Sequence, residues 1–157
     1  MSERAIQTTL IEAPADACWE VATDFERYPE WAGDIKHVTV TERDEGGRAV
    51  VVRFRSAAFG RSTSYTLRYN YEESPRVLSW VEVDGDLTTK LDGSYEFSEL
   101  VRTGGLGTPL AATEVVYRLE AELKVPILPF LKRRVEGRIM HTALRELKAR
   151  VEARPAP

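Results

Sequence analysis

Apolar and polar residues alternate along most of residues 35–125, and this pattern constrains the fold more than any other feature of the sequence. Tyr65, Leu67 and Tyr69 fall on one side of an extended chain, whereas Thr66 and Arg68 fall on the other. The same alternation gives a common apolar face to Tyr71, Leu91, Tyr95, Phe97, Val115, Tyr117, Leu119, Ala121 and Leu123. A period of two residues predicts β-strands, and a sheet with one apolar and one polar face is typically antiparallel.

Short turn sequences divide this region into six predicted strands. The turns contain Gly, Pro and Asp, which accept the backbone angles of tight turns, at DEGG (44–47), FG (59–60), SP (74–75) and DGD (84–86). Because no helical pattern separates them, the strands are expected to form an antiparallel meander. The predicted strands cover residues 35–42, 48–57, 62–73, 76–83, 87–100 and 112–125.

Two parts of this region are less constrained. In the strand at residues 76–83 either face can be buried, because Val77, Val81 and Val83 compete with Leu78 and Trp80. The glycine run at 104–107 precedes a strand instead of opening a helix and lacks the Lys-Ser/Thr of a phosphate-binding loop. We therefore expect a hairpin or a mobile lid there.

The N-terminal part predicts one strand followed by two short helices. Residues 4–12 are rich in Ile, Thr and Leu, and Pro14 suits the first turn of a helix. Cys18, Val21, Ala22 and Phe25 then recur at helical spacing. A break between the two helices is expected near Tyr28, because the residue before a proline disfavours the helical conformation.

The C-terminal part predicts one long amphipathic helix, from beyond Pro126 to about Arg154. Its apolar stripe contains Leu128, Leu131, Val135, Ile139, Ala143, Leu147 and Val151, widened by Met140 and Leu144. The charges expected on the opposite face are Lys132, Arg133, Glu136, Arg145, Glu146, Lys148, Arg150 and Glu152. About 25 helical residues make a rod of roughly 38 Å, long enough to cross a whole sheet.

These elements together predict an internal cavity. The apolar face of the sheet needs a cover, and the terminal helix is the largest amphipathic element available. A twisted sheet curls, so a straight helix is not expected to contact all of its concave face. The predicted ligand-binding residues are Tyr65, Leu67, Tyr69, Trp80, Leu91, Tyr95, Phe97, Tyr117, Leu119, Val135, Ile139, Met140 and Ala143. The alternative is that the same residues form an ordinary packed core.

Composition and charge exclude several classes of function. The 22 Lys and Arg residues against 25 Asp and Glu residues give a net charge of -3, which disfavours nucleic-acid binding. The single cysteine, Cys18, allows no intramolecular disulfide and no cysteine-rich zinc site. His37 and His141 are far apart in the sequence, so we expect no metal and no cofactor. No secretory signal is evident, so we expect a cytoplasmic location.

The sequence resembles the START-like (SRPBCC) superfamily, and within it the polyketide cyclase/dehydrase and lipid-transport group. The resemblance rests on residues 11–35 (IEAPADACWEVATDFERYPEWAGDI), on residues 79–97 (SWVEVDGDLTTKLDGSYEF) and on ELKARVE near the end of the last helix. It implies a helix-grip fold of the α+β class and a single domain over residues 1–157. In that fold a seven-stranded antiparallel curved sheet wraps around a long C-terminal helix, with two short helices after strand 1.

The resemblance implies binding of a hydrophobic or aromatic molecule such as a lipid or polyketide, with transport of that molecule as an extension of binding. The main alternative is a polyketide cyclase/dehydratase, in which the tyrosines would act as donors and Glu82 or Arg53 as the charged group. Arg53 and Arg55 are expected to face outward, so the sequence presents no clear inward acid and base pair. A third possibility is an interaction protein with a filled interior. The identity of the ligand and the oligomeric state stay open.

The start of the terminal helix combines apolar and basic residues. The run VPILPFL (125–131) precedes Lys132, Arg133, Arg134 and Arg138. This combination is compatible with transient contact with an anionic membrane. The alternative is an amphipathic helix with an ordinary polar face.

Overall fold

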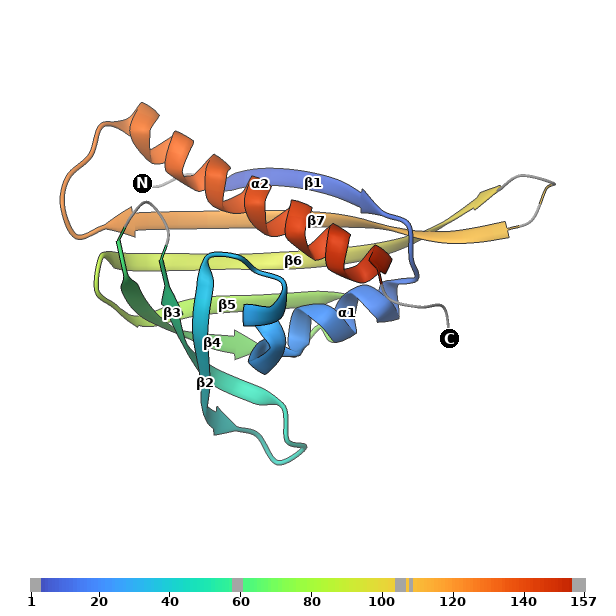
Figure 1. The fold of residues 1–157 in the computed structure, drawn as a ribbon, viewed down its shortest axis with the longest axis horizontal. Helices are drawn as coiled ribbons and strands as arrows, with labels where there is room; N and C mark the ends of the chain where they lie inside the picture. Colours follow the sequence, from blue (N-terminus) through green and yellow to red (C-terminus); the bar gives the residue numbers. More distant parts are fainter. Residues whose placement is uncertain (1–3, 58–60, 104–106, 108, 154–157) are drawn as a thin grey trace.

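A computed structural model describes residues 4–57, 61–103, 107 and 109–153 of the chain. The predicted glycine run at 104–107 and the turn at Phe59–Gly60 fall wholly or mostly outside the described residues, as does the predicted helix end at Arg154. The elements are β1 (Ala5–Ile11), α1 (Ala15–Thr23), the 3-10 helix η1 (Phe25–Glu30), β2 (Ile35–Arg43), β3 (Ala49–Ser56), β4 (Thr63–Asn70), β5 (Val77–Gly85), β6 (Thr88–Thr103), β7 (Pro109–Leu123) and α2 (Pro129–Ala153) (Figure 1).

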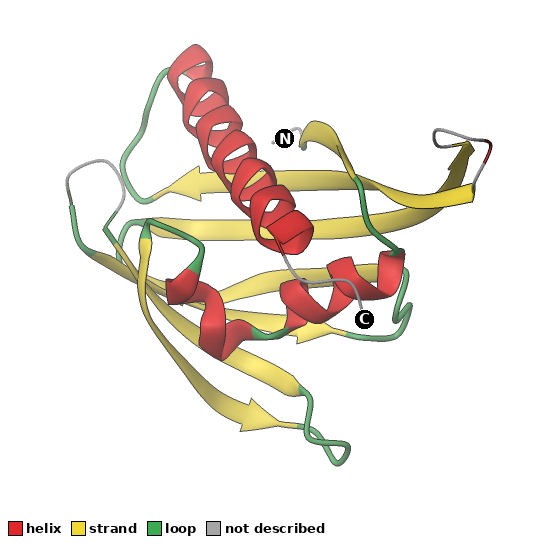
Figure 2. Cartoon of the chain, turned by 45° about the vertical axis from the view of Figure 1, so that its right-hand side comes forward, coloured by secondary structure: helices red, strands yellow, loops and turns green. Residues whose placement is uncertain are grey.

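The seven strands form one antiparallel sheet with the order β1-β7-β6-β5-β4-β3-β2. The predicted meander is therefore confirmed, and β1 closes the sheet by pairing with β7. Register shifts in the β2–β3 and β4–β5 pairs add local bends to the twist of the sheet. The sheet curves around α2, which lies across its concave side (Figures 1 and 2).

The apolar face of the sheet is the concave one. Leu67, Tyr69 and Tyr117 are buried there, as the alternation predicts. The open register of residues 76–84 is also settled, because Trp80 faces inward with an exposed fraction of 6%, whereas Val83 is 56% exposed. The whole strand therefore presents its aromatic side to the interior.

The break between the two N-terminal helices lies at Asp24, four residues before the predicted position at Tyr28. Asp24 has non-helical backbone angles (φ -88°, ψ 71°), and η1 then includes both Tyr28 and Pro29. Pro29 is accommodated because η1 is a short 3-10 helix and not an α-helix. The hydroxyl of Tyr28 donates a hydrogen bond to the carbonyl of Ala22, 2.5 Å away, in the last turn of α1.

One charged residue of α2 is not where the sequence pattern placed it. Glu136 was expected on the solvent face, but it is 2% exposed. Its carboxylate accepts a hydrogen bond of 2.9 Å from the backbone N–H of Ala121. In the described residues β1 begins at Ala5, which pairs with Leu119 of β7. Ala121 of β7 lies beyond this last pair, so its N–H has no carbonyl acceptor on β1, and the Glu136 carboxylate accepts its hydrogen bond instead. No helix in the described ranges is both long and apolar enough to cross a membrane.

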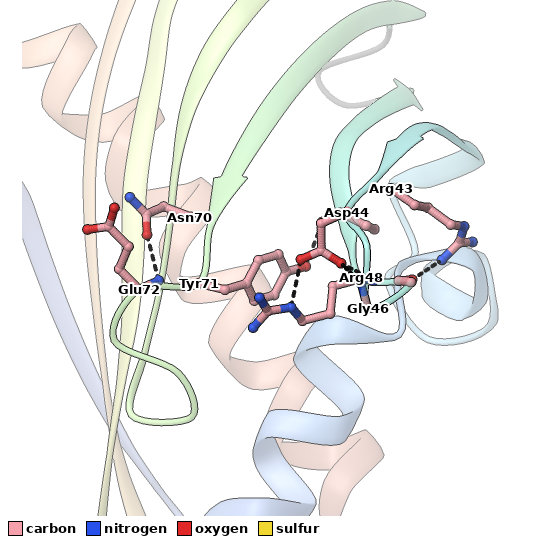
Figure 3. Close-up of polar contacts among 9 residues, drawn as sticks. Arg43, Asp44, Gly46, Arg48, Asn70, Tyr71 and Glu72 are labelled. Carbon is pink, nitrogen blue, oxygen red and sulfur yellow. Dashed lines mark hydrogen bonds and ion pairs between the residues drawn. The ribbon is translucent and has the colours of Figure 1, made fainter.

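The predicted turn between β2 and β3 is stabilised by Asp44 (Figure 3). One carboxylate oxygen of Asp44 accepts hydrogen bonds from the backbone N–H groups of Gly46 (3.0 Å) and Arg48 (2.9 Å), and the other accepts one from Arg48 Nε (2.8 Å). These bonds, led by the one from the Arg48 backbone, lower the pKa of Asp44. Gly47 has a φ of +85°, which favours glycine, and the Arg48 guanidinium lies 4.7 Å from the centre of the Tyr71 ring.

Candidate ligand-binding site

A cavity lies between α2 and the concave face of the sheet. α2 packs chiefly against β1, β7 and α1, which are all at one side of the concave face. The remaining space, bordered by residues of β3 to β7, has a volume of about 400 Å³ and is reached partly from solvent. This volume lies within the range of about 300–1,000 Å³ that is typical of small-molecule pockets.

Most of the predicted lining residues border this cavity. They are Tyr65, Leu67, Tyr69, Trp80, Leu91, Tyr95, Tyr117, Val135, Ile139 and Ala143. Phe97, Leu119 and Met140 do not border it and instead belong to the packed core, with exposed fractions of 3% or less. Phe97 shares the apolar face of β6 with Tyr95, but it lies beneath α1, where the Trp19 ring packs against it at 6.0 Å.

The helix α2 carries two neighbouring apolar stripes, and only one of them faces the cavity. Val135, Ile139 and Ala143 border the cavity. The adjacent stripe consists of the buried residues Glu136, Met140, Leu144, Leu147 and Val151. Since α2 contacts β1, β7 and α1, we attribute this second stripe to packing against them. Met140 therefore lies on the packed stripe and not among the residues that border the cavity.

Aromatic rings on adjacent strands form the floor of the cavity. Tyr95 and Tyr117 are direct cross-strand neighbours, with ring centres 4.6 Å apart, and Trp80 lies 5.3 Å from Tyr95. The strand neighbour of Trp80 is Gly93. A Cβ atom on Gly93 would lie only 2.7 Å from the Trp80 ring, so the indole packs directly against a backbone without a side chain.

The tyrosine hydroxyls around the cavity fall into two kinds. Tyr28 uses its hydroxyl to bind the carbonyl of Ala22. The others, on Tyr65, Tyr69, Tyr95 and Tyr117, form no hydrogen bond with any part of the chain that the structure describes. In that part of the chain, every side-chain oxygen that is sealed from solvent has a hydrogen-bond partner. These four hydroxyls have no partner, so they are not sealed and are open to the cavity. They are donors available to a ligand.

Several lining residues were not predicted. Tyr28, Trp31 and Phe54 add aromatic surface, and the sequence had marked them only as part of the YPEW motif or of a buried strand face. Asp34, Arg61 and Arg138 also border the cavity, and because all three are exposed they mark the mouth. The remaining unpredicted lining residues are Ala32, Ile35, Ser56, Thr63, Leu87, Thr88, Ala121, Leu123, Ile127, Lys132, Thr142 and Glu146. Alternation had marked Ala121 and Leu123 as part of the apolar face, whereas the positions of Ala32, Leu87 and Ile127 depend on how loops dock around the cavity.

The sequence matches the family described as polyketide cyclase/dehydrase and lipid transport over residues 4–152. The chain belongs to this family. The START-like resemblance is thereby confirmed, and binding of hydrophobic small molecules is a known property of the family. No curated protein sequence matches the chain.

Solved structures confirm the helix-grip fold of this family member. A START superfamily protein from Mycobacterium smegmatis has a TM-score of 0.85 at 23% identity, with 95% of this chain and 97% of that one covered. The Zhui aromatase/cyclase from Streptomyces sp. R1128 has a TM-score of 0.78 at 18% identity, with 97% and 94% covered. The ginseng major latex-like protein 151 from Panax ginseng has a TM-score of 0.68 at 16% identity, with 95% and 97% covered.

In this polyketide cyclase/dehydrase family protein, the cavity tyrosines are hydrogen-bond donors and not bases. Burial is the main cause that raises the pKa of Tyr65, Tyr69, Tyr95 and Tyr117 above the ordinary value for tyrosine. The carboxylate of Asp34 raises the pKa of Tyr65 further. These tyrosines therefore keep their protons at neutral pH and can donate to a carbonyl or to a developing enolate oxygen.

The described residues that border the cavity include no histidine and no cysteine. Among the described residues, no group of three or more His, Cys, Asp or Glu side chains could hold a metal ion. His37 and His141 are both exposed. Cys18 is fully buried, and burial raises the pKa of its thiol to about 11, so little of the reactive thiolate forms at neutral pH.

Proposed function

We propose that this protein binds an apolar or aromatic small molecule in the cavity under α2. The observation that supports this most directly is the cavity itself: about 400 Å³ of space enclosed mainly by aromatic and aliphatic side chains. At the roughly 30 Å³ that each water molecule occupies in the liquid, this volume equals about 13 water molecules. Close-packed protein interiors contain few voids larger than one water molecule, so a space of this size is not ordinary core packing.

The apolar surface of the cavity supplies part of the binding free energy. A ligand that buries about 300 Å² of apolar surface gains on the order of 7 kcal/mol, at roughly 25 cal/mol per Å². Association costs reduce this gain. Even without those costs the gain corresponds to a Kd of only about 10 μM, so micromolar binding also requires hydrogen bonds to the ligand.

The open hydroxyls favour a ligand that carries oxygen atoms. Tyr65, Tyr69, Tyr95 and Tyr117 present donors on the same concave surface as the aromatic floor. A ligand without acceptors would strip water from these donors and leave them unpaired, which costs about 1–3 kcal/mol for each group. A hydrocarbon body with carbonyl or hydroxyl groups along it fits this surface better than a plain alkane.

The proposal is tested by looking for ligand in the purified protein and by adding a probe. Native mass spectrometry and organic extraction would detect a co-purified molecule, and titration with dansyl-labelled undecanoic acid would report uptake by an increase in fluorescence. Ala143→Phe adds a ring to the wall of the cavity and should abolish uptake. Ala153→Phe adds the same ring at the exposed end of the same helix and should not.

Two results would count against binding. One is the absence of any co-purified molecule together with no uptake of the probe. The other is equal uptake by the wild type and Ala143→Phe, because the probe would then bind somewhere other than the cavity.

A second candidate function is cyclisation of a poly-β-keto chain. It is favoured by one observation, the position of Asp34 on the cavity wall near Tyr65. The carboxylate would take a proton from the carbon between two carbonyls, the tyrosine would donate to the enolate oxygen, and the carbanion would attack another carbonyl carbon of the same chain. The structural similarity to an aromatase/cyclase is compatible with this candidate.

Simple binding has the stronger support. In the described residues, no hydrogen bond joins a charged side chain to any of the four open hydroxyls, and Asp34 is exposed at the mouth. The two candidates are separated by incubation with a poly-β-keto thioester and analysis of the products. Unchanged products with Asp34→Asn and with Tyr65→Phe would remove the cyclase candidate, whereas loss of a cyclised product with both would establish it.

A further inference from the structure

An exposed apolar surface lies beside the mouth of the cavity. We call residues 124–134, the connection from β7 and the first turns of α2, the entrance segment. Val125 is 65% exposed, Leu128 58%, Phe130 51% and Leu131 40%. In Figure 1 this segment forms the orange loop and helix end at the outer edge of the molecule. Four large apolar residues so close together in the chain are not needed to cover the core.

The apolar surface of the entrance segment continues into the cavity. Ile127, within the segment, already borders the cavity, and Val135 and Ile139 border it from the next turns of α2. Leu131 precedes Val135 by four residues and Leu128 precedes Leu131 by three, so these side chains lie along one side of the helix and the turn that leads into it. An apolar path thus runs from the exposed surface into the binding site.

The charge of the entrance segment is opposite to that of the whole chain. The segment contains Lys124, Lys132, Arg133 and Arg134 and no acidic residue, whereas the chain has a net charge of -3. Arg133 and Arg134 are exposed. Lys132 pairs with Glu122 at 3.1 Å and lies 4.0 Å from the buried Glu136, so the exposed basic charge of the segment rests mainly on Arg133 and Arg134.

A second copy of the chain is a poor partner for this surface. In a two-fold dimer the same patch would face itself, so the basic residues of both copies would come together and repel. An anionic bilayer satisfies both properties, because its interface accepts leucine and phenylalanine while its headgroups attract lysine and arginine. We propose that the entrance segment docks on the surface of an anionic lipid bilayer and places the mouth of the cavity against the lipid.

The test is co-sedimentation with sucrose-loaded vesicles. One set contains three parts phosphatidylcholine to one part phosphatidylserine, and the other contains phosphatidylcholine alone. The wild type should bind the first set more strongly than the second, and added salt should release it. Arg133→Ser with Arg134→Ser should weaken binding by about 30-fold.

Matched control variants distinguish an effect of the entrance segment from a general effect of surface charge or surface hydrophobicity. Arg53→Ser with Arg55→Ser removes the same charge from exposed positions on β3 and should leave binding within about twofold of the wild type. Leu128→Ser should weaken binding by about tenfold. Leu110→Ser, at a position 51% exposed on β7, should leave it unchanged. All these residues are exposed, so the variants are expected to fold.

The proposal is overturned if the entrance variants bind phosphatidylserine vesicles like the wild type, if the controls lose as much binding, or if both vesicle sets bind equally. A concentration-dependent dimer in sedimentation velocity that Leu128→Ser abolishes would also overturn it and assign the surface to a second copy. Uptake of the fluorescent probe is measured separately from vesicle binding. The entrance variants should keep uptake of dansyl-labelled undecanoic acid in solution, whereas Ala143→Phe should lose uptake but keep vesicle binding.

Discussion

Around the cavity, some tyrosine hydroxyls are hydrogen-bonded to the protein and others are not, so replacing tyrosine by phenylalanine should affect stability differently at the two kinds of position. Tyr28→Phe removes a hydroxyl that donates to the carbonyl of Ala22 over 2.5 Å. Tyr117→Phe removes a hydroxyl with no partner in the described part of the chain. The first change is expected to destabilise the protein, and the second is expected to leave stability unchanged or slightly raised.

The size of the difference follows from the position of Ala22. This residue is 1% exposed and lies in the last turn of α1, where backbone carbonyls lack partners within the helix. Water therefore has little access to replace the lost donor. A net hydrogen bond contributes about 1 kcal/mol, and an unpaired buried carbonyl raises the cost to about 1–2 kcal/mol. For a chain of this length, that corresponds to a decrease in Tm of about 3–6 °C.

The assay is urea unfolding followed by tryptophan fluorescence, with a thermal melt of each variant. Tyr28→Phe should lower the midpoint without changing the slope. Tyr117→Phe should stay within about 0.5 kcal/mol of the wild type and, if the ligand accepts its hydrogen bond, should weaken ligand binding by about 3–10-fold. Equal destabilisation by the two changes would refute the reasoning, because Tyr117 would then have a partner inside the protein and would not be available to a ligand.

Three further predictions concern single positions. Gly93→Ala should cost about 1–3 kcal/mol and change the tryptophan emission, because its Cβ would lie 2.6 Å from the backbone oxygen of Arg118 and 2.7 Å from the Trp80 ring. Normal stability and emission would contradict the packing described. Burial raises the pKa of Glu136 above its ordinary value of about 4.5, so the folded state holds this proton to higher pH than the unfolded state does. The free energy of unfolding should therefore fall as pH rises above about 4.5. In urea titrations at several pH values, Glu136→Gln should reduce that fall. An unchanged pH dependence in this variant would show that Glu136 is not its source. The Cys18 thiol, with its pKa of about 11, should react with Ellman's reagent at pH 8 more than about 100-fold more slowly in the native state than in guanidinium, and similar rates would show that it is not buried.

The strands and their buried faces were predictable because alternation is a local property. Tyr65, Leu67 and Tyr69 lie on the concave face as the sequence indicates, since successive side chains of any strand point to opposite sides. At Trp80 the pattern was ambiguous because both faces of β5 carry large apolar residues. Only pairing with Tyr69 and Gly93 on the neighbouring strands decides which face is inward.

Errors arose where a residue's surroundings come from distant parts of the chain. Phe97 and Met140 lie on the correct apolar faces, but α1 and the adjoining strands cover them. Glu136 is charged and was therefore assigned to solvent, yet a backbone N–H beyond the start of β1 holds it in the interior. Helical spacing identifies an apolar side of α2 but does not distinguish a stripe that packs from a neighbouring stripe that borders empty space.

The amino-acid sequence alone determined the antiparallel sheet, the terminal helix, the expectation of a space between them and the family. These depend on periodicity and on motifs, which involve neighbours along the chain. The tertiary structure decided which aromatic residues border that space, which hydroxyls are left open, and that the exposed apolar residues before and within the first turns of α2 lie beside the mouth. Those properties depend on where the helix rests on the curved sheet, and that position is set by contacts between residues more than a hundred positions apart, such as Gln7 with Gly137 and Lys148 with Leu10.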